Sequence, residues 1–187
     1  YLKDLGVQTV MCGNLATLRL TKEVGLRPMG GFGLNLFNSS ALEAAYNMGL
    51  KEVIISPELS GKEIKRLYAP YGQKLFAVCY GRQPLMLTRN CPVKNGIGCR
   101  GKKEYCHLTD RKGNTFPVVC ENGFCEILNT KTTDLLDCLE SLSVDCGCLC
   151  FTIESPEDTK EILIAYRSRK GRNAKDFTRG LFRSGVL

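Results

Sequence analysis

Residues 38–56 decide how the fold is interpreted, and they read Asn38-Ser-Ser-Ala-Leu-Glu-Ala-Ala-Tyr-Asn-Met-Gly-Leu-Lys-Glu-Val-Ile-Ile-Ser56. Asn38 or Ser39 can cap a helix whose apolar residues recur at helical spacing, and Gly49 is placed to end that helix. The short β-branched run that follows predicts a buried strand at residues 52–56. A helix, a turn and a strand in this order form the repeating unit of an α/β protein.

The same unit recurs on both sides of this stretch. Strands are expected at residues 7–11, 28–34, 52–56, 74–80 and 145–153, and helices after caps at Asn14, Asn38, Ser60, Thr133 and Ser155. The first four strands begin about 20 to 25 residues apart, which is the period of βα units with short loops. Gly30-Gly-Phe-Gly33 has the wrong spacing for a dinucleotide-binding loop, and its glycines would instead admit a ligand or a neighbouring backbone.

We predict an α/β fold, specifically a partial (β/α)8 barrel of the TIM type that contains the C-terminal strands. The 187 residues are expected to form one domain, a fragment of a larger barrel whose N-terminal half is missing, because five strands cannot close the barrel. Within it, residues 1–80 carry the βα repeats and residues 81–131 a cysteine-rich insertion with a β-hairpin. Residues 132–187 return as helix, strand, helix and tail.

Composition limits the compartment and the partners. The longest apolar runs are too short to span a bilayer and no secretory leader is visible, so a cytoplasmic location is expected. Reduced thiols and metal ligation are favoured there over disulfides for the eleven cysteines. The formal net charge of +7 indicates an anionic partner such as nucleic acid, although solvated basic faces explain it equally well.

Four cysteines lie where the regular repeat stops, and they are the predicted metal ligands: Cys91, Cys99, Cys106 and Cys120. Thiolates suit an iron–sulfur cluster or tetrahedral zinc. Structural zinc sites favour closely spaced cysteine pairs, so the wide spacing here favours a 4Fe–4S cluster, with zinc and unligated thiols as alternatives. Cys125 is the alternate fourth ligand, because it would lie opposite Cys120 across a hairpin centred on Asn122-Gly123.

The other cysteines are expected to be packing residues, and hydrolytic chemistry is disfavoured. Cys146, Cys148 and Cys150 alternate along one predicted strand and so share a face. The single histidine, His107, follows Cys106 directly and has no evident nucleophile as a partner. No catalytic residue is identified from these patterns.

Several motifs along the chain carry a resemblance to a known family. They are Tyr80-Gly-Arg-Gln-Pro-Leu-Met-Leu-Thr-Arg-Asn-Cys-Pro92, Thr109-Asp-Arg-Lys-Gly113, Phe116-Pro-Val118, Glu126-Ile-Leu-Asn129, Val10-Met-Cys-Gly-Asn14, Leu34-Asn-Leu-Phe-Asn38, Ser56-Pro-Glu-Leu59 and Thr178-Arg-Gly-Leu-Phe-Arg-Ser-Gly-Val186. With these motifs the sequence resembles the collagenase-like peptidase family U-32 over essentially its whole length. The closest resemblance is to the long members of the branch that hydroxylates ribosomal RNA.

The resemblance implies a function as well as a fold. Members of this family resemble (β/α)8 barrels that carry a 4Fe–4S cluster on four cysteines. Oxygen-independent hydroxylation of an RNA pyrimidine is implied, in ribosomal or transfer RNA and with prephenate as a co-substrate, or hydroxylation of a ubiquinone precursor. The family name implies proteolysis as the alternative. RNA is the implied partner of the full-length protein, and the fragment alone is expected to be inactive.

Barrel enzymes place their sites at the C-terminal ends of strands, which suggests candidate substrate-binding residues. The candidates that follow predicted strands are Asn35, Asn38, Ser56, Glu58, Tyr80 and Arg82. Further candidates, chosen because arginine binds anions, are Arg89, Arg111, Arg179 and Arg183. The arginines could bind phosphate or carboxylate groups in a bidentate manner, or could be surface residues. Asn38 could equally be a helix cap. Self-association is expected at the open edge of the barrel, because unpaired strand edges favour it.

Overall fold

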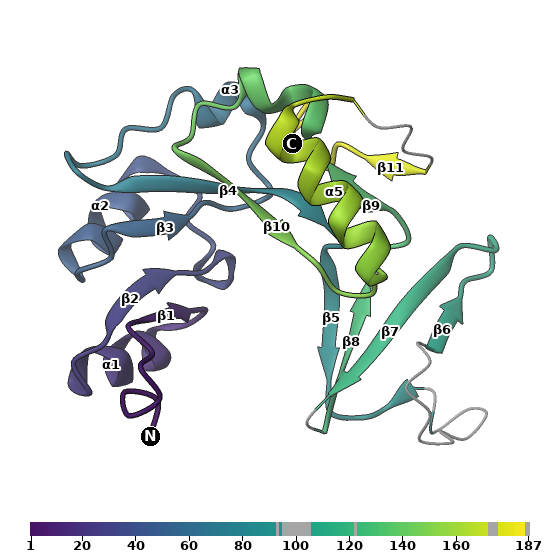
Figure 1. Ribbon diagram of the computed structural model, residues 1–187, viewed down its shortest axis with the longest axis horizontal. Helices are drawn as coiled ribbons and strands as arrows, with labels where there is room; N and C mark the ends of the chain where they lie inside the picture. The colour runs from purple at the N-terminus through teal and green to yellow at the C-terminus, as the bar shows by residue number, and fades with distance from the viewer. Residues whose placement is uncertain (93, 95–105, 122, 172–175, 186–187) are drawn as a thin grey trace. The chain divides into compact units, whose positions relative to one another are not determined.

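The computed structural model describes residues 1–92, 94, 106–121, 123–171 and 176–185 and shows a mixed α/β protein with a parallel sheet (Figure 1). The chain divides into two compact units. Unit 1 contains Tyr1–Cys79, Asp137–Leu149 and Arg179–Leu187, and unit 2 contains Tyr80–Leu136 and Cys150–Thr178.

Four strands of unit 1 lie side by side and parallel, in chain order. They are β1 (Thr9–Cys12), β2 (Arg27–Gly30), β3 (Glu52–Ile54) and β4 (Lys74–Gly81), whose last two residues belong to unit 2. Strand β10 (Cys146–Cys150) pairs with β4. Consecutive parallel strands require a crossover between them, and the predicted βα repeat supplies it. The prediction of an α/β fold with a parallel sheet is confirmed.

The helices between these strands begin at the predicted caps. They are α1 (Leu15–Glu23), α2 (Ser39–Asn47) and α3 (Gly61–Ile64). The side chain of Asn14 accepts a hydrogen bond from the amide of Thr17 at 2.8 Å, and that of Asn38 accepts one from the amide of Ala41 at 2.9 Å. These bonds satisfy amide groups that the first helical turn leaves unpaired, so local chemistry fixes where the helices start.

One apolar core joins the helices to the sheet of unit 1. Leu42 of α2 and Val53 of β3 are fully buried in it, together with Leu50. The predicted strand at residues 28–34 is shorter than expected, because the chain turns into a 3-10 helix, η1 (Phe32–Leu34), after β2. A Cβ on Gly33 would lie 2.7 Å from the carbonyl oxygen of Gly13, so this glycine admits a neighbouring backbone.

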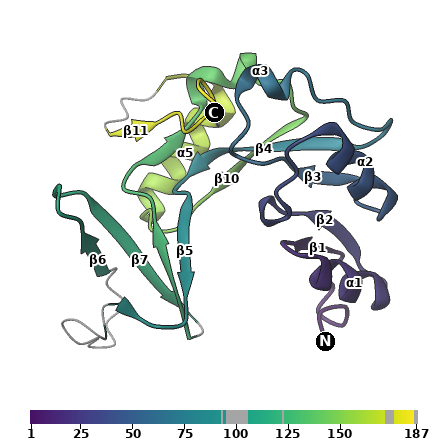
Figure 2. The same ribbon diagram turned by 180° about the vertical axis from the view of Figure 1, so that it is seen from behind.

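Unit 2 contains a four-stranded antiparallel sheet that includes much of the predicted insertion (Figures 1 and 2). Its order is β5 (Pro84–Thr88), β8 (Phe124–Leu128), β7 (Thr115–Glu121) and β6 (Cys106–Thr109). Glu121 pairs with Phe124, which confirms the hairpin predicted around residues 122–123. Strands β5 and β6 were not predicted. In β5, Leu85-Met86-Leu87 is continuously apolar and lacks the alternation of apolar and polar residues that indicates a half-buried strand, and all three side chains are exposed.

A second part of unit 2 surrounds the end of β4. Strand β9 (Thr132–Asp134) pairs antiparallel with Tyr80 and Gly81 and parallel with β11 (Phe177–Thr178). The prediction that Thr133 caps a helix is wrong: this β-branched residue lies in β9, and a 3-10 helix, η2 (Leu136–Ser141), follows.

Helix α5 (Pro156–Ser168) lies against β9 in both views of the chain (Figures 1 and 2). The Tyr166 hydroxyl donates to the carboxylate of Asp134 at 2.8 Å, and this bond links the two elements. Ser155 and Asp158 form a capping box at the predicted start of the helix. None of the described helices is long and apolar enough to cross a membrane, and the cytoplasmic location stays a prediction.

The packing of unit 1 predicts the effect of truncating its core. Replacement of the fully buried Leu42 by alanine should lower the free energy of unfolding by about 2 to 5 kcal/mol, because it removes buried methyl groups and leaves a cavity. Urea denaturation followed by circular dichroism measures the change. Glu43→Ala, at an exposed position of the same helix, is the matched control and should change the value by less than about 0.5 kcal/mol. Equal effects of the two substitutions would contradict this packing.

Candidate metal centre

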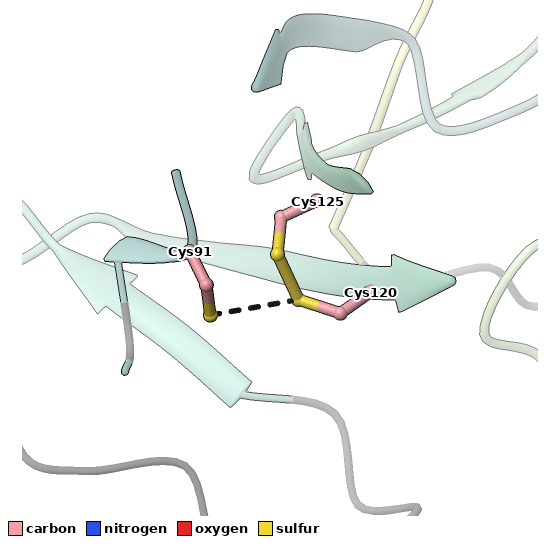
Figure 3. A group of neighbouring side chains, drawn as sticks. All are labelled: Cys91, Cys120 and Cys125. Atoms are coloured by element: carbon pink, nitrogen blue, oxygen red, sulfur yellow. Dashed lines mark hydrogen bonds between the residues drawn. A yellow bond between two sulfur atoms is a disulfide. The ribbon is translucent and has the colours of Figure 1, made fainter. Parts of the chain in front are cut away.

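Three cysteines of unit 2 come together where three neighbouring strands meet. Cys120 of β7 lies directly opposite Cys125 of β8, and Cys125 lies opposite Thr88 at the end of β5. The chain continues from Thr88 to Cys91 within three residues. The pairing of β5, β8 and β7 therefore delivers all three sulfur atoms to one place, as Figure 3 shows.

The sulfur atoms of this cysteine triad, Cys91, Cys120 and Cys125, all lie within 4.8 Å of one another. The Sγ atoms of Cys91 and Cys120 are 3.9 Å apart. The backbone amide of Lys94 donates to the Cys91 sulfur at 3.4 Å and so helps to orient it. Three convergent sulfur atoms are the donor set that soft metal ions prefer.

Two of the three sulfur atoms are joined to each other in this structure. Cys120 and Cys125 form a disulfide, and Cys91 points toward it (Figure 3). The expectation of reduced thiols is therefore not met at this pair, because the register of β7 and β8 places the two sulfur atoms within bonding reach. Since thiolates are the metal ligands, the triad can hold a metal only after this bond is reduced.

The other two predicted ligands are Cys106, which the structure describes, and Cys99, which it does not. Cys106 is the first residue of β6 and lies opposite Val118 of β7. It packs against the same small apolar cluster, Val118 and Cys125, that Cys91 also contacts. Cys99 lies outside the described residues. Cys120 and Cys125 were predicted as alternatives for the fourth metal ligand, and both lie at the site.

The surroundings of the triad are asymmetric. Cys125 is buried, whereas Cys120 is exposed, so one side of the site is open to water. The guanidinium of Arg89 lies 5.2 Å from the centre of the Phe124 ring, and this cation–π contact holds a positive charge within two residues of Cys91.

The spacing of the sulfur atoms can be compared with two kinds of metal centre. Around a tetrahedral zinc ion with Zn–S bonds of about 2.3 Å, neighbouring sulfur atoms lie about 3.8 Å apart. The 3.9 Å between Cys91 and Cys120 fits that edge. A 4Fe–4S cluster binds each cysteine to a different iron, so its cysteine sulfur atoms lie farther apart. Once the disulfide is reduced, this distance matches a single tetrahedral ion, whereas a cluster requires the sulfur atoms to move farther apart.

Four of the substrate-binding candidates gather at the carboxyl ends of β2 and β3 in unit 1. Asn35, Asn38, Ser56 and Glu58 flank a parallel bridge between Leu36 and Ile55. Asn38 caps α2, and the Ser56 hydroxyl, which is buried, accepts a hydrogen bond from the Glu58 amide at 3.3 Å. Asn35 and Glu58 are exposed at this edge of the sheet.

Several of the remaining candidates have partners within their own unit. In unit 2 Arg82 donates to the carbonyl oxygens of Asn129 and Thr130. The buried Tyr80 donates to the carboxylate of Glu154 at 3.2 Å. These contacts give Arg82 and Tyr80 a structural role, whereas Arg111 is exposed between β6 and β7.

The two C-terminal arginine candidates lie in unit 1. Arg179 forms an ion pair with Asp137, and Arg183 is exposed nearby in sequence. The hydrogen bond from the Arg179 guanidinium lowers the pKa of Asp137. Burial raises the pKa of the adjacent Cys138 thiol, and the Asp137 carboxylate adds to that effect. This ion pair joins residues that are 42 positions apart, so no local sequence pattern predicted it.

No protein-family model, curated protein or solved structure matches this chain.

The strand register predicts how the cysteines will behave in protein purified under air. Trypsin should release residues 113–131 as one peptide, which contains Cys120 and Cys125 and no other cysteine. Without reductant, this peptide should resist alkylation and be lighter than its reduced form by the mass of two hydrogen atoms. Mass spectrometry measures both properties. A peptide that is fully alkylated before reduction would contradict the disulfide.

Proposed function

We propose that this chain is the metal-binding part of a collagenase-like U-32 family protein, and that its cysteine triad holds the metal once Cys120 and Cys125 are reduced. The observation that carries the proposal is the convergence of three sulfur atoms within 4.8 Å. A structural disulfide alone does not account for the third sulfur. Cys91 has no role in a bonded pair, yet it is a natural ligand for a metal that the same two cysteines share.

Two cofactors are consistent with these residues. The resemblance to the family favours a 4Fe–4S cluster, which would supply one-electron chemistry at the site. The distance between Cys91 and Cys120 favours a single tetrahedral ion such as zinc. In either case a fourth ligand is needed, and we propose Cys106, which packs against the same apolar cluster, or Cys99.

The fold proposed for this part of the protein is a segment of a (β/α)8 barrel. Strands β1 to β4 lie parallel and in chain order, and β10 pairs with β4 after the intervening antiparallel sheet. Successive βα units of such a barrel have this order of neighbours. Self-association at an open edge of this sheet belongs to the same proposal.

For the full-length protein we propose hydroxylation of an RNA pyrimidine, with prephenate as a co-substrate. The resemblance is to the RNA-hydroxylating branch, and the net charge of +7 suits a polyanionic partner. The peptidase alternative has less support. His107 is exposed on β6, on the opposite side of that strand from Cys106, and no residue in the described ranges forms a hydrogen bond with its imidazole.

Metal loading should depend on reduction and on the triad. Protein reduced anaerobically and supplied with iron and sulfide should develop broad absorption near 400 nm, as clusters do. Protein supplied with zinc should instead bind one ion without colour. Cys91→Ser, Cys120→Ser and Cys125→Ser should each weaken binding of the preferred metal by about tenfold or more, because each removes a thiolate.

The control for this experiment is Cys146→Ser, which replaces an exposed cysteine outside the triad and should leave metal binding unchanged. Omission of the reductant should abolish loading of the wild-type chain. Stoichiometric loading of unreduced protein, or loading that survives all three triad substitutions, would rule out the proposed centre.

The proposed reaction predicts a change in RNA. Cells in which the full-length protein carries Cys91→Ser should lose an oxygen-bearing pyrimidine from ribosomal or transfer RNA, because the metal centre is no longer assembled. Mass spectrometry of digested nucleosides detects the loss, and Cys146→Ser should retain the modification. Unchanged nucleosides in the Cys91→Ser cells, or gelatin cleavage by the full-length protein, would favour another function.

A further inference from the structure

A recessed cluster of basic residues lies where the parallel strands of unit 1 begin. Arg27, Glu52 and Lys74 are the first residues of β2, β3 and β4, and Lys51 directly precedes Glu52. Neighbouring parallel strands start at the same edge of a sheet, so residues that are more than 20 positions apart in sequence come together. A hydrogen bond from the Lys74 amide to the Lys51 carbonyl, 2.8 Å long, fixes two of these strand starts beside each other.

The cluster surrounds a pocket of about 440 Å³, which we call the strand-edge pocket. Arg27, Lys51, Glu52 and Lys74 line it together with two turn glycines, Gly49 and Gly72. Both glycines have positive φ, at 92° and 82°, and leave these parts of the wall without side chains. The volume lies within the range of pockets that hold small ligands, roughly 300 to 1,000 Å³.

The positive charges of this pocket form no close ion pair with the carboxylates that the structure describes. Within the described ranges, none of Arg27, Lys51 and Lys74 has a carboxylate within ion-pair distance. Arg27 donates from Nε to the Thr9 hydroxyl at 3.0 Å, which holds its guanidinium in place and leaves the terminal NH₂ groups for another acceptor. All three side chains are exposed and can reach a ligand.

A fourth cation, Lys22, lies beside Gly49, which is one of the lining residues of the pocket. The Lys22 ammonium donates to the Met48 carbonyl at 3.2 Å and lies 3.8 Å from the point where a Cβ on Gly49 would sit. The positive charges of these side chains repel one another. An anion that contacts several of them reduces this repulsion, and its binding is therefore favourable. Phosphate suits such a site, because an arginine fork and lysine ammonium groups donate to its several oxygens.

We propose that the strand-edge pocket binds the phosphate of a small phosphorylated sugar. Glu52, the acidic residue of the lining, would repel a phosphate placed beside it but can accept hydrogen bonds from hydroxyl groups. The arrangement therefore suits a ligand that has a phosphate at one end and hydroxyl groups at the other. This site shares no residue with the cysteine triad, so it stands or fails independently of the metal proposal.

The experiment is a titration of isotope-labelled protein with ribose 5-phosphate at constant ionic strength, followed through the amide signals of Gly49 and Gly72 in nuclear magnetic resonance spectra. Both signals should shift and saturate. The triple variant Arg27→Gln/Lys51→Gln/Lys74→Gln should bind at least about tenfold more weakly, since each charged hydrogen bond lost is worth roughly that factor. Circular dichroism should show that the variant remains folded.

A matched variant separates this site from a general effect of charge. Lys62→Gln/Lys65→Gln/Arg66→Gln removes the same charge from exposed positions at α3 and should retain wild-type affinity. Equal weakening of both variants, or the absence of saturable shifts at the two glycines, would overturn the proposal. Binding of polyuridylate without binding of ribose 5-phosphate would also overturn it, because the surface would then recognise a nucleic-acid backbone.

Discussion

The antiparallel register of β7 and β8 is the constraint on which the candidate metal centre depends. The two-residue connection between Glu121 and Phe124 forces Cys120 and Cys125 to face each other. The pairing of β5 with β8 then brings Cys91 to the same point. A slip of one residue would send the sulfur atoms to opposite faces of the sheet, so the site exists only in this register. No single strand contains it.

The short distances between the three sulfur atoms permit either a disulfide or a metal bound by thiolates, and these two states exclude each other. Sulfur atoms that are bonded to each other cannot serve as thiolate ligands, and thiolates bound to a metal cannot form a disulfide. Metal loading at the proposed centre would therefore be coupled to the redox state of Cys120 and Cys125. Cys91 distinguishes this site from a simple cross-strand disulfide, because its sulfur lies 3.9 Å from that of Cys120 in the oxidised form.

Local patterns in the sequence predicted where α1, α2 and α5 begin, and the structure confirms these three starts. Asn14, Asn38 and Ser155 cap helices as expected, because each cap involves only the following three residues. Features that depend on distant pairing were missed. Thr133 lies in a strand because β4 pairs with it, and the strand-edge pocket collects Arg27, Lys51 and Lys74 from three separate turns of the repeat. Cys120 and Cys125 were treated as alternatives, although a hairpin that places them opposite each other makes them a pair.

X-ray absorption spectroscopy of the reduced, metal-loaded chain reads the ligands of the metal directly. We expect a first shell of sulfur at about 2.3 Å, the usual metal–thiolate distance. In the Cys91→Ser variant, any metal that remains should exchange one sulfur neighbour for oxygen. A first shell made mainly of nitrogen or oxygen in the wild-type chain, or an unchanged sulfur shell in Cys91→Ser, would show that the cysteine triad is not the metal site.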